Sequence, residues 1–306
     1  MTGTGERVAD RGDGTVFFLS DYGRRDEFVG VVHAVLHRLA PTAAVVDLTH
    51  DVPPFDVRAG ASALMRAFPH LGPGVVLAVV DPGVGGPRRA VAVEVAAGAG
   101  PRWLVGPDNG LLPPASDLVG GPRRAFVLDP VKSTIGPVGA LVGVDVPPVP
   151  RLDPQGSETP VTFDGRDLFA PAAAALATGA DPEALGKEVE PSSLQREAEP
   201  VVQHGLSAEG QRWVRAEVTW VDRFGNVQLA ARGGLVPESV GEAALTVAGD
   251  AVHLRTVRRV RTFADLSPGE PGLLTDGNGH LTLVAREASA ADHFGVSAGM
   301  LVEVVW

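Results

Sequence analysis

The chain contains no cysteine among its 306 residues, and this absence excludes several kinds of chemistry together. Disulfide bonds, thiolate nucleophiles and cysteine-based zinc sites are all ruled out. The eight histidines are scattered along the chain, so we expect neither a metal site nor a metal cofactor. A composition without thiols is compatible with a reducing compartment, and we expect a cytoplasmic protein.

Lysine and net positive charge are also scarce, because the chain has only two lysines and a formal net charge of −11. No basic stretch carries interleaved aromatic residues, so the electrostatic footprint needed to bind a phosphate backbone is missing. No apolar run approaches the length of a membrane span, and the N-terminal stretch MTGTGERVADRGDGTV lacks the apolar segment of a signal peptide. We therefore expect no nucleic acid partner and no membrane attachment.

Two patterns of hydrophobic residues divide the chain. From Val16 to about Gly186, short apolar runs alternate with helical segments, which is typical of a sheet flanked by helices. After a polar, proline-containing stretch, short alternating strands indicate an antiparallel barrel or sandwich with one short helix. We predict an α/β domain over residues 12–190 and a smaller β domain over 200–306. The stretch 133–160, rich in glycine, proline and valine, has no period and predicts a long surface loop.

An acid and an arginine frame a glycine-rich loop in the sequence VVDPGVGGPRR. Asp81 lies where a buried strand is predicted to end, and the loop that follows is able to bring Arg88 back beside it. An adjacent guanidinium favours the ionised form of the carboxylate, so Asp81 is a candidate functional acid. The same pattern is equally typical of a loop that an ion pair holds in place.

Three further loops that follow strand-like runs carry candidate binding residues. The carboxylate of LSDYG is able to accept two hydrogen bonds from a vicinal diol such as a ribose, although acids after strands also serve as turn residues or helix caps. The stretch TFDGRDLFAPAAAAL combines an aromatic, an acid and a glycine, but it is also typical of a well-capped helix start. VDRFGNVQ is equally typical of a hairpin turn. The candidates are Asp21, Phe163, Asp164, Gly165, Asp222, Phe224 and Asn226.

Seven motifs, in order, resemble one family: the S-adenosylmethionine-dependent fluorinases and chlorinases together with the S-adenosylmethionine hydroxide adenosyltransferases. The resemblance runs from about Val16 to the C-terminus. It implies an N-terminal α/β domain, a C-terminal antiparallel β-barrel, and a homotrimer whose active sites lie between the N-terminal domain of one subunit and the C-terminal domain of the next. The motifs are LSDYGRRDEFVG, VVDLTHDVPPFDV, VVDPGVGGPRR, GPDNGLL, TFDGRDLFAPAAA, VDRFGN and ASAADHFGVSAGMLVEV.

The resemblance also implies a reaction in which a nucleophile attacks the C5′ carbon of S-adenosylmethionine and expels methionine. The acid of LSDYG is implied to form hydrogen bonds with the ribose hydroxyls. The phenylalanines of PPFDV and TFDG are implied to pack against the sugar and the reacting carbon. The residues of VDRFGN and of the later turn TDGNGHLTL are implied to contact the methionine or the adenine, the former from the neighbouring subunit. The implied substrate-binding residues are Asp21, Phe55, Phe163, Gly165, Asp222, Phe224, Asn226 and Asn278.

The nucleophile is implied by positions at which the branches of the family differ. The fluorinase carries an aromatic residue at the position of Asp81 and a serine at that of Gly165, whereas the hydroxide adenosyltransferases share the Asp81 and Arg88 found here. Carboxylates in the pocket repel a halide, so water is the expected nucleophile. The hydroxide adenosyltransferases read TFHGRD where this chain has Asp164, and two acids near one arginine are able to share a proton.

We therefore predict an S-adenosylmethionine hydrolase that forms adenosine and L-methionine. Asp81 is expected to orient a water molecule beside C5′, Arg88 to fix that carboxylate, and Asp164 to stand in for the family histidine. No metal or cofactor is expected, since S-adenosylmethionine is the substrate. The alternatives are a chlorinase-like S-adenosylmethionine-dependent halogenase and a non-catalytic trimer that only binds S-adenosylmethionine.

Overall fold

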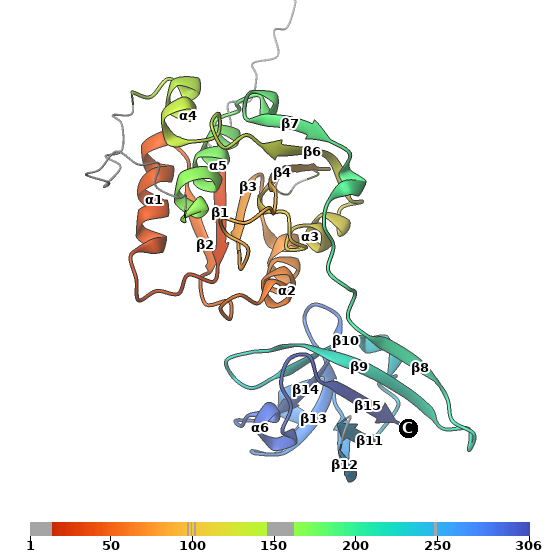
Figure 1. Cartoon of the computed structure of the whole chain (residues 1–306). Helices are drawn as coiled ribbons and strands as arrows, with labels where there is room; N and C mark the ends of the chain where they lie inside the picture. Colours follow the sequence, from red (N-terminus) through yellow and green to blue (C-terminus); the bar gives the residue numbers. More distant parts are fainter. Residues whose placement is uncertain (1–13, 97, 99, 101, 146–161, 248–249) are drawn as a thin grey trace, which may run out of the picture. The chain divides into compact units, whose positions relative to one another are not determined.

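The chain divides into two compact units, which end and begin at Glu197 and Ala198. We call them the N-terminal and the C-terminal unit (Figure 1). The structure is a computed structural model and describes residues 14–96, 98, 100, 102–145, 162–247 and 250–306. Within these ranges, no helix is long and apolar enough to cross a membrane.

A seven-stranded sheet forms the centre of the N-terminal unit, with the strand order β2-β1-β3-β5-β4-β6-β7 (Figure 1). The first four strands in this order pair in parallel, and the other three are antiparallel to their neighbours. The central strands are runs of valine and alanine that are buried on both faces, as expected for a sheet covered by helices. The strands are β1 (Thr15–Ser20), β2 (Val45–Thr49), β3 (Gly74–Val79), β4 (Ala90–Val95), β5 (Trp103–Pro107), β6 (Pro122–Leu128) and β7 (Gly186–Val189).

Two groups of helices pack in the N-terminal unit. In the first, α1 (Phe28–Leu39), α4 (Ile135–Val142) and α5 (Ala170–Ala177) contact one another, and in the second α2 (Val57–Ala67) contacts α3 (Pro113–Asp117). Every residue of α5 is buried, because its run of alanines lets the helix approach the sheet closely. Short 3₁₀ segments are η1 (Phe68–His70), η3 (Pro182–Ala184) and η4 (Pro191–Ser193), and η2 (Gly165–Phe169) is a π-helical segment.

The predicted surface loop over 133–160 is wrong in its first part, because Ile135–Val142 forms α4. Gly143 ends this helix in the left-handed conformation with φ of 76°, which a glycine adopts without strain. Val138 and Gly139 are buried where α4 contacts α1 and α5. The apolar residues that the sequence reading took as aperiodic therefore form a short packed helix. Residues 146–161 lie outside the described ranges.

A closed antiparallel barrel forms the C-terminal unit, which confirms the predicted fold class. Seven strands follow one another around the barrel in the order β9-β10-β14-β13-β12-β11-β15, and β15 pairs again with β9. β8 adds to β9 outside this ring, and β12 with β13 is the one parallel pair among the described strands of the C-terminal unit. The strands are β8 (Val202–Leu206), β9 (Arg212–Val221), β10 (Val227–Arg232), β11 (Glu242–Val247), β12 (Asp250–Arg259), β13 (Pro271–Thr275), β14 (His280–Ala285) and β15 (Leu301–Val305).

The expected short helix of the C-terminal unit is α6 (Ala290–Phe294), and Ser289 caps it by accepting a hydrogen bond from the backbone N–H of Asp292. Two 3₁₀ segments, η5 (Gly233–Leu235) and η6 (Phe263–Asp265), complete the unit. Valine, leucine and alanine side chains from all seven barrel strands fill the interior. This unit thus presents its loops on a closed barrel of seven strands.

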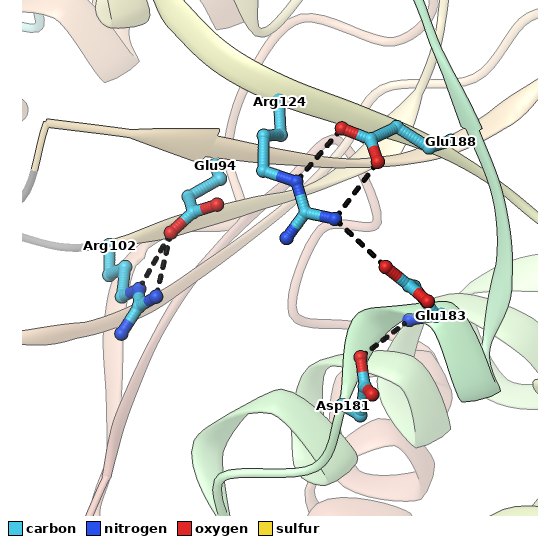
Figure 2. Close-up of polar contacts among 6 residues, drawn as sticks. All are labelled: Glu94, Arg102, Arg124, Asp181, Glu183 and Glu188. Carbon is cyan, nitrogen blue, oxygen red and sulfur yellow. Dashed lines mark hydrogen bonds and ion pairs between the residues drawn. The ribbon is translucent and has the colours of Figure 1, made fainter.

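Polar contacts also tie the far strands of the N-terminal sheet together. Arg124 on β6 donates from Nε to Glu188 Oε1 on β7 at 2.8 Å and from Nη2 to Glu183 Oε1 at 3.1 Å (Figure 2). Arg102 pairs similarly with Glu94 on β4, from Nη2 to Oε1 at 2.7 Å. Arg102, Glu183 and Glu188 are largely exposed, so these contacts lie at the surface.

Candidate active site

Two of the predicted acids follow neighbouring strands of the N-terminal sheet. β1 and β3 pair in parallel with Ser20 opposite Val79, so Asp21 and Asp81 emerge at the same edge of the sheet. The chain passes from β1 to β2 on one side and returns as β3 on the other side of β1. Open α/β sheets bind ligands at such a switch point, outside the carboxyl ends of the strands. The fold therefore places both acids where a ligand site is expected.

Asp81, Arg88 and Asp164 form one group of contacting side chains at this edge. Arg88 Nε donates to both carboxylate oxygens of Asp81 at 3.0 Å, and Arg88 Nη2 donates to Asp81 Oδ2 and to Asp164 Oδ2. All three side chains are largely buried. The loop between Asp81 and Arg88 closes through Gly83, whose position leaves only 3.3 Å between an added Cβ and Arg88 Cγ. A side chain at Gly83 would therefore press on the arginine.

The backbone around Asp164 departs from a regular helix. The π-helical segment η2 begins directly after Asp164 and runs into α5. The backbone N–H groups of Arg166 and Asp167 both donate to Phe163 O, at 3.1 and 3.0 Å. Asp167 does not cap the helix and forms an ion pair with Arg166. π-helical turns occur often at functional sites, and this one sets the direction in which Asp164 meets Arg88.

The electrostatics of the group favour fixed charges. Burial alone would lower the pKa of Arg88, but hydrogen bonds and charges from Asp81 and Asp164 outweigh burial and raise it. The Arg88 guanidinium also lies 5.2 Å from the centre of the Phe169 ring. A carboxylate offers about four lone-pair positions, so one guanidinium shared by two carboxylates leaves acceptor capacity for a water molecule or a ligand. The group is suited to hold and polarise a small donor.

An aromatic cluster lies beside these acids. The ring of Phe163 contacts Tyr22 and Phe28 edge to face, with centroids 5.5 and 5.2 Å apart. A Cβ at Gly165 would lie 1.9 Å from Tyr22 Oη, so only glycine allows the tyrosine its position. Burial raises the pKa of Tyr22, and the charges of Asp21 and Asp81 raise it further. The hydroxyl is thus neutral and close to the acids on both strands.

Sequence reasoning missed Tyr22 as a site residue. It lies in LSDYG, directly after the acid that was selected, and it is the only tyrosine of the chain. The presence of a single tyrosine beside this acid does not show where its side chain lies, because tyrosines commonly follow strands. Only the packing of Phe163 and Gly165 against Tyr22 places its hydroxyl over Gly165.

Asp21 and Phe55 are joined by a hydrogen bond, from the backbone N–H of Phe55 to Asp21 Oδ2 at 2.9 Å. Burial raises the pKa of Asp21, against the effect of this hydrogen bond. Phe55 has a φ of 68°, an uncommon conformation for a bulky residue, and the residue is 72% exposed. Such strain persists where the surroundings enforce it, and it often marks functional loops. An open depression lies beside this loop, lined by Pro54, Phe55, Asp56, Val57, Arg58, Pro82 and Glu197.

In the C-terminal unit, Asp222, Phe224 and Asn226 share the turn between β9 and β10. Asp222 Oδ1 accepts from the backbone N–H groups of Phe224 and Asn226 at 2.8 and 2.9 Å, and Asn226 Nδ2 donates to Asp222 Oδ2 at 2.8 Å. The acid thus shapes the turn, as an ordinary hairpin acid does, and Phe224 in this turn is 70% exposed.

Asn278 lies in a different turn, between β13 and β14. Its backbone N–H donates to Asp276 Oδ1 at 2.8 Å, and its carbonyl accepts from Arg232 Nη1 at 3.1 Å. The N-terminal candidates are therefore brought together around Asp81 and Tyr22, whereas the C-terminal candidates form two separate turns. Within the described ranges, none of the predicted site residues belongs to a set of donors close enough to hold a metal ion.

Comparison with known proteins matches both units to one family. The model for the SAM hydroxide adenosyltransferase N-terminal domain matches residues 16–186, and that for the C-terminal domain matches residues 216–303. A protein of Salinispora tropica named (R)-S-adenosyl-L-methionine hydrolase is 43% identical over 93% of this chain and 95% of its own. One of the same name from Thermus thermophilus is 42% identical over 95% of this chain and 99% of its own.

More distant relatives carry a different name. A fluorinase of Actinopolyspora mzabensis is 28% identical over 94% of this chain and 96% of its own. Among solved structures, an uncharacterized conserved protein from Thermotoga maritima superimposes with a TM-score of 0.77 at 27% identity, covering 94% of this chain and 99% of that one. The similarity thus spans both units, and it is greater to the hydrolases than to the fluorinase.

Proposed function

The chain belongs to the SAM hydroxide adenosyltransferase family, and we propose on this basis that it hydrolyses S-adenosyl-L-methionine to adenosine and L-methionine. The observation that carries the proposal is the identity of 42–43%, over nearly the whole chain, to proteins named as hydrolases of this substrate. The geometry of Asp81, Arg88 and Asp164 supports it independently, because it provides acceptors for a water molecule at the switch point of the sheet.

The reaction is a displacement at the C5′ carbon of the ribose. A water oxygen forms the new bond to C5′, the C5′–S bond breaks, and the sulfur keeps the bonding electron pair as it becomes the neutral thioether of methionine. The water loses one proton to a carboxylate and on to solvent. The sulfonium is a good leaving group, so positioning the water and accepting its proton supply most of what the protein must add.

Asp81 is assigned to orient the attacking water, and Arg88 to fix the carboxylate. The paired N–H donors of a guanidinium hold a carboxylate in one plane, which limits the directions from which Asp81 accepts a further hydrogen bond. The buried setting strengthens these interactions and keeps competing water away. Arg88 therefore acts on the reaction through the position of Asp81.

Asp164 takes the place of the histidine that the family motif TFHGRD carries. It shares Arg88 with Asp81, so the group holds two carboxylates and one guanidinium. Either carboxylate is within reach to receive the proton of the water. Asp164→Asn and Asp164→His separate these roles: the amide keeps a hydrogen bond to Arg88 but accepts no proton, whereas the imidazole has one acceptor nitrogen, which is able to take the proton of the water.

Substrate binding is assigned to residues of both units. Asp21 binds the ribose hydroxyls, and Phe55 and Phe163 pack against the sugar. Gly165 leaves room for the sugar. Asp222, Phe224, Asn226 and Asn278 contact the methionine or adenine of a substrate held by a neighbouring subunit in a homotrimer. Support comes from the hydrogen bond that joins Asp21 to the Phe55 backbone, and from the exposure of Phe55 and Phe224, which leaves both residues able to contact a ligand. No metal or further cofactor takes part.

The shared site is tested by complementation. Asp81→Asn and Asn226→Ala subunits, each inactive alone, are co-expressed, and the mixed assembly is purified. Sites built from two subunits combine intact halves in the mixed trimers, so a fraction of the activity returns. If the mixed assembly stays inactive while light scattering shows a trimer, each subunit completes its own site.

Product analysis tests the reaction itself. Purified protein is incubated with S-adenosyl-L-methionine, with and without chloride, and the nucleosides are separated by mass. Adenosine that forms at a rate independent of chloride supports the hydrolase. A halogenated adenosine that requires chloride identifies a halogenase, and saturable binding without any nucleoside identifies a binding protein.

A further inference from the structure

Two histidines and an aspartate meet near the end of β2, apart from the Asp81 group. His33 comes from α1, Asp47 from β2, and His50 follows β2 directly. Nε2 of His33 lies 2.7 Å from Asp47 Oδ1, and Nε2 of His50 lies 3.1 Å from the same oxygen. Across the part of the chain that the structure describes, no other set of three histidine or acid side chains brings its donor atoms this close together.

His50 is completely buried, yet its Nε2 has no hydrogen-bond partner. The contact with Asp47 has a suitable length, but its direction does not meet hydrogen-bond geometry. The other ring nitrogen, Nδ1, lies 2.8 Å from Ser20 Oγ. A buried ring nitrogen without a partner is uncommon in proteins, and coordination of a cation would satisfy it.

The donor set has the chemistry of a transition-metal site. Zn²⁺ binds histidine nitrogen and carboxylate oxygen at about 2.0–2.2 Å, so its ligand atoms lie roughly 3–3.5 Å apart. The contacts of 2.7 and 3.1 Å differ little from this spacing. The side chains of His33 and Asp47 are 37% and 27% exposed, which leaves one side open to water as a further ligand. Ser20 Oγ fits the outer acceptor that usually orients a metal-bound imidazole.

We propose that His33, Asp47 and His50 bind one divalent transition-metal ion of the zinc class, with water completing the coordination. The ion joins α1 to the end of β2. It also fixes the segment that carries Asp21, because Gly23 N–H donates to His50 O at 2.7 Å and Tyr22 N–H donates to Ser20 Oγ at 3.3 Å. The site is structural and does not touch the reacting atoms.

Without an ion, His33 and Asp47 form a hydrogen bond beside the buried ring of His50. The two states differ in metal content, which is measurable without any enzyme assay.

The test uses untagged full-length protein, stripped with a chelator and titrated with ZnCl₂ in a calorimeter. We expect one ion per chain for the wild type and for His37→Ala, which removes an exposed imidazole one turn further along α1. His33→Ala and Asp47→Asn, both at partly exposed side chains, lose this binding. Ser20→Ala weakens the affinity by about 10–100-fold, as losses of outer hydrogen bonds typically do.

Binding of Co²⁺ provides a second measurement on the same proteins. Co²⁺ bound by imidazole and carboxylate gives visible absorption bands, which the wild type and His37→Ala should show and His33→Ala should lack. The proposal is overturned if the wild type takes up no zinc, or if His33→Ala and Asp47→Asn bind zinc as the wild type does. Equal loss in His37→Ala also overturns it, since the ligands would then lie along the helix.

Discussion

Two arginines of the N-terminal unit are each held between two acids, and they differ chiefly in burial. Arg88 contacts Asp81 and Asp164, with side-chain exposures of 13, 7 and 11%. Arg124 contacts Glu188 and Glu183, with exposures of 36, 47 and 66% (Figure 2). A group of one cation between two carboxylates thus occurs once at the switch point of the sheet and once at its far strands.

Burial changes what such a group contributes. Exposed ion pairs are weakened by water and salt, so the Arg124 group adds little beyond linking β6 to β7. In the Arg88 group each charge depends on its partners, because an unpaired buried charge is costly. Low local polarity also strengthens hydrogen bonds to a bound water or substrate. We infer that the position in the fold, and not the identity of the residues, gives the Arg88 group its role in the reaction and the Arg124 group a structural role.

The largest effect is expected for Asp81→Asn, which removes the charge of one acid and keeps its size. Turnover should fall by about 10²–10⁴-fold, the usual contribution of a positioned acid or base, while the affinity for S-adenosyl-L-methionine changes little. Single-turnover kinetics and calorimetric binding measure the two quantities separately. Glu188→Gln is the matched change in the Arg124 group and should leave both quantities at their wild-type values. Unchanged turnover in Asp81→Asn would remove Asp81 from the mechanism.

Arg88→Ala is expected to reduce stability as well as turnover. It leaves two buried carboxylates without a cation, and breaking a buried pair in this way typically costs about 3–5 kcal/mol of the free energy of unfolding. Denaturant unfolding monitored by circular dichroism measures the loss. Arg88→Lys keeps the charge but lacks the planar pair of donors, so it should recover stability more than turnover. Wild-type stability in Arg88→Ala would mean that the acids are not held by this arginine.

A smaller effect is expected for Gly165→Ala, which tests how tightly the site is packed. The added Cβ meets Tyr22 Oη, and the required displacement typically costs about 1–3 kcal/mol, with a rise in KM because the aromatic wall moves. Gly30→Ala is the matched control, since nothing lies within 4 Å of its added Cβ. Adding Tyr22→Phe to Gly165→Ala removes the clashing hydroxyl and should restore part of the loss. If Tyr22→Phe restores nothing, the loss in Gly165→Ala has a cause other than the contact with the hydroxyl.

The smallest effect is expected for Arg124→Ala, which removes the cation of the exposed group. Turnover should equal that of the wild type, and the midpoint of thermal unfolding should stay close to it, because these side chains are solvated in either state. Scanning calorimetry at low and high salt measures the change. A loss comparable to that of Arg88→Ala would erase the distinction between the two groups.

The sequence was most informative where an acidic side chain follows directly after a predicted strand. Asp21 and Asp81 were selected because each follows a strand-like run, and the parallel pairing of β1 with β3 brings them to one edge. The alternating short strands predicted a barrel or a sandwich, and the family resemblance implied the barrel, whose closure between β9 and β15 depends on pairings that no local pattern specifies. Local periodicity thus predicts elements and their ends, and long-range pairing decides which ends meet.

Other features could not be predicted because they depend on contacts between distant segments. The helix α4 has too few polar residues to show a period, and it is stabilised by packing on α1 and α5. Tyr22 becomes a site residue only because the π-helical turn after Asp164 brings Gly165 beneath it. His33 is likewise separated in sequence from Asp47 and His50, and α1 must pack beside β2 before the three meet.

The origin of the new oxygen tests the role of the Arg88 group most directly. A single turnover with enzyme in excess over S-adenosyl-L-methionine is run in ¹⁸O-labelled water, and the adenosine is analysed by mass spectrometry. Attack by a water that Asp81 orients predicts that the 5′-oxygen carries the label at the enrichment of the solvent. Unlabelled adenosine would show that the oxygen came from a carboxylate of the protein, and that Asp81 or Asp164 attacks C5′ itself.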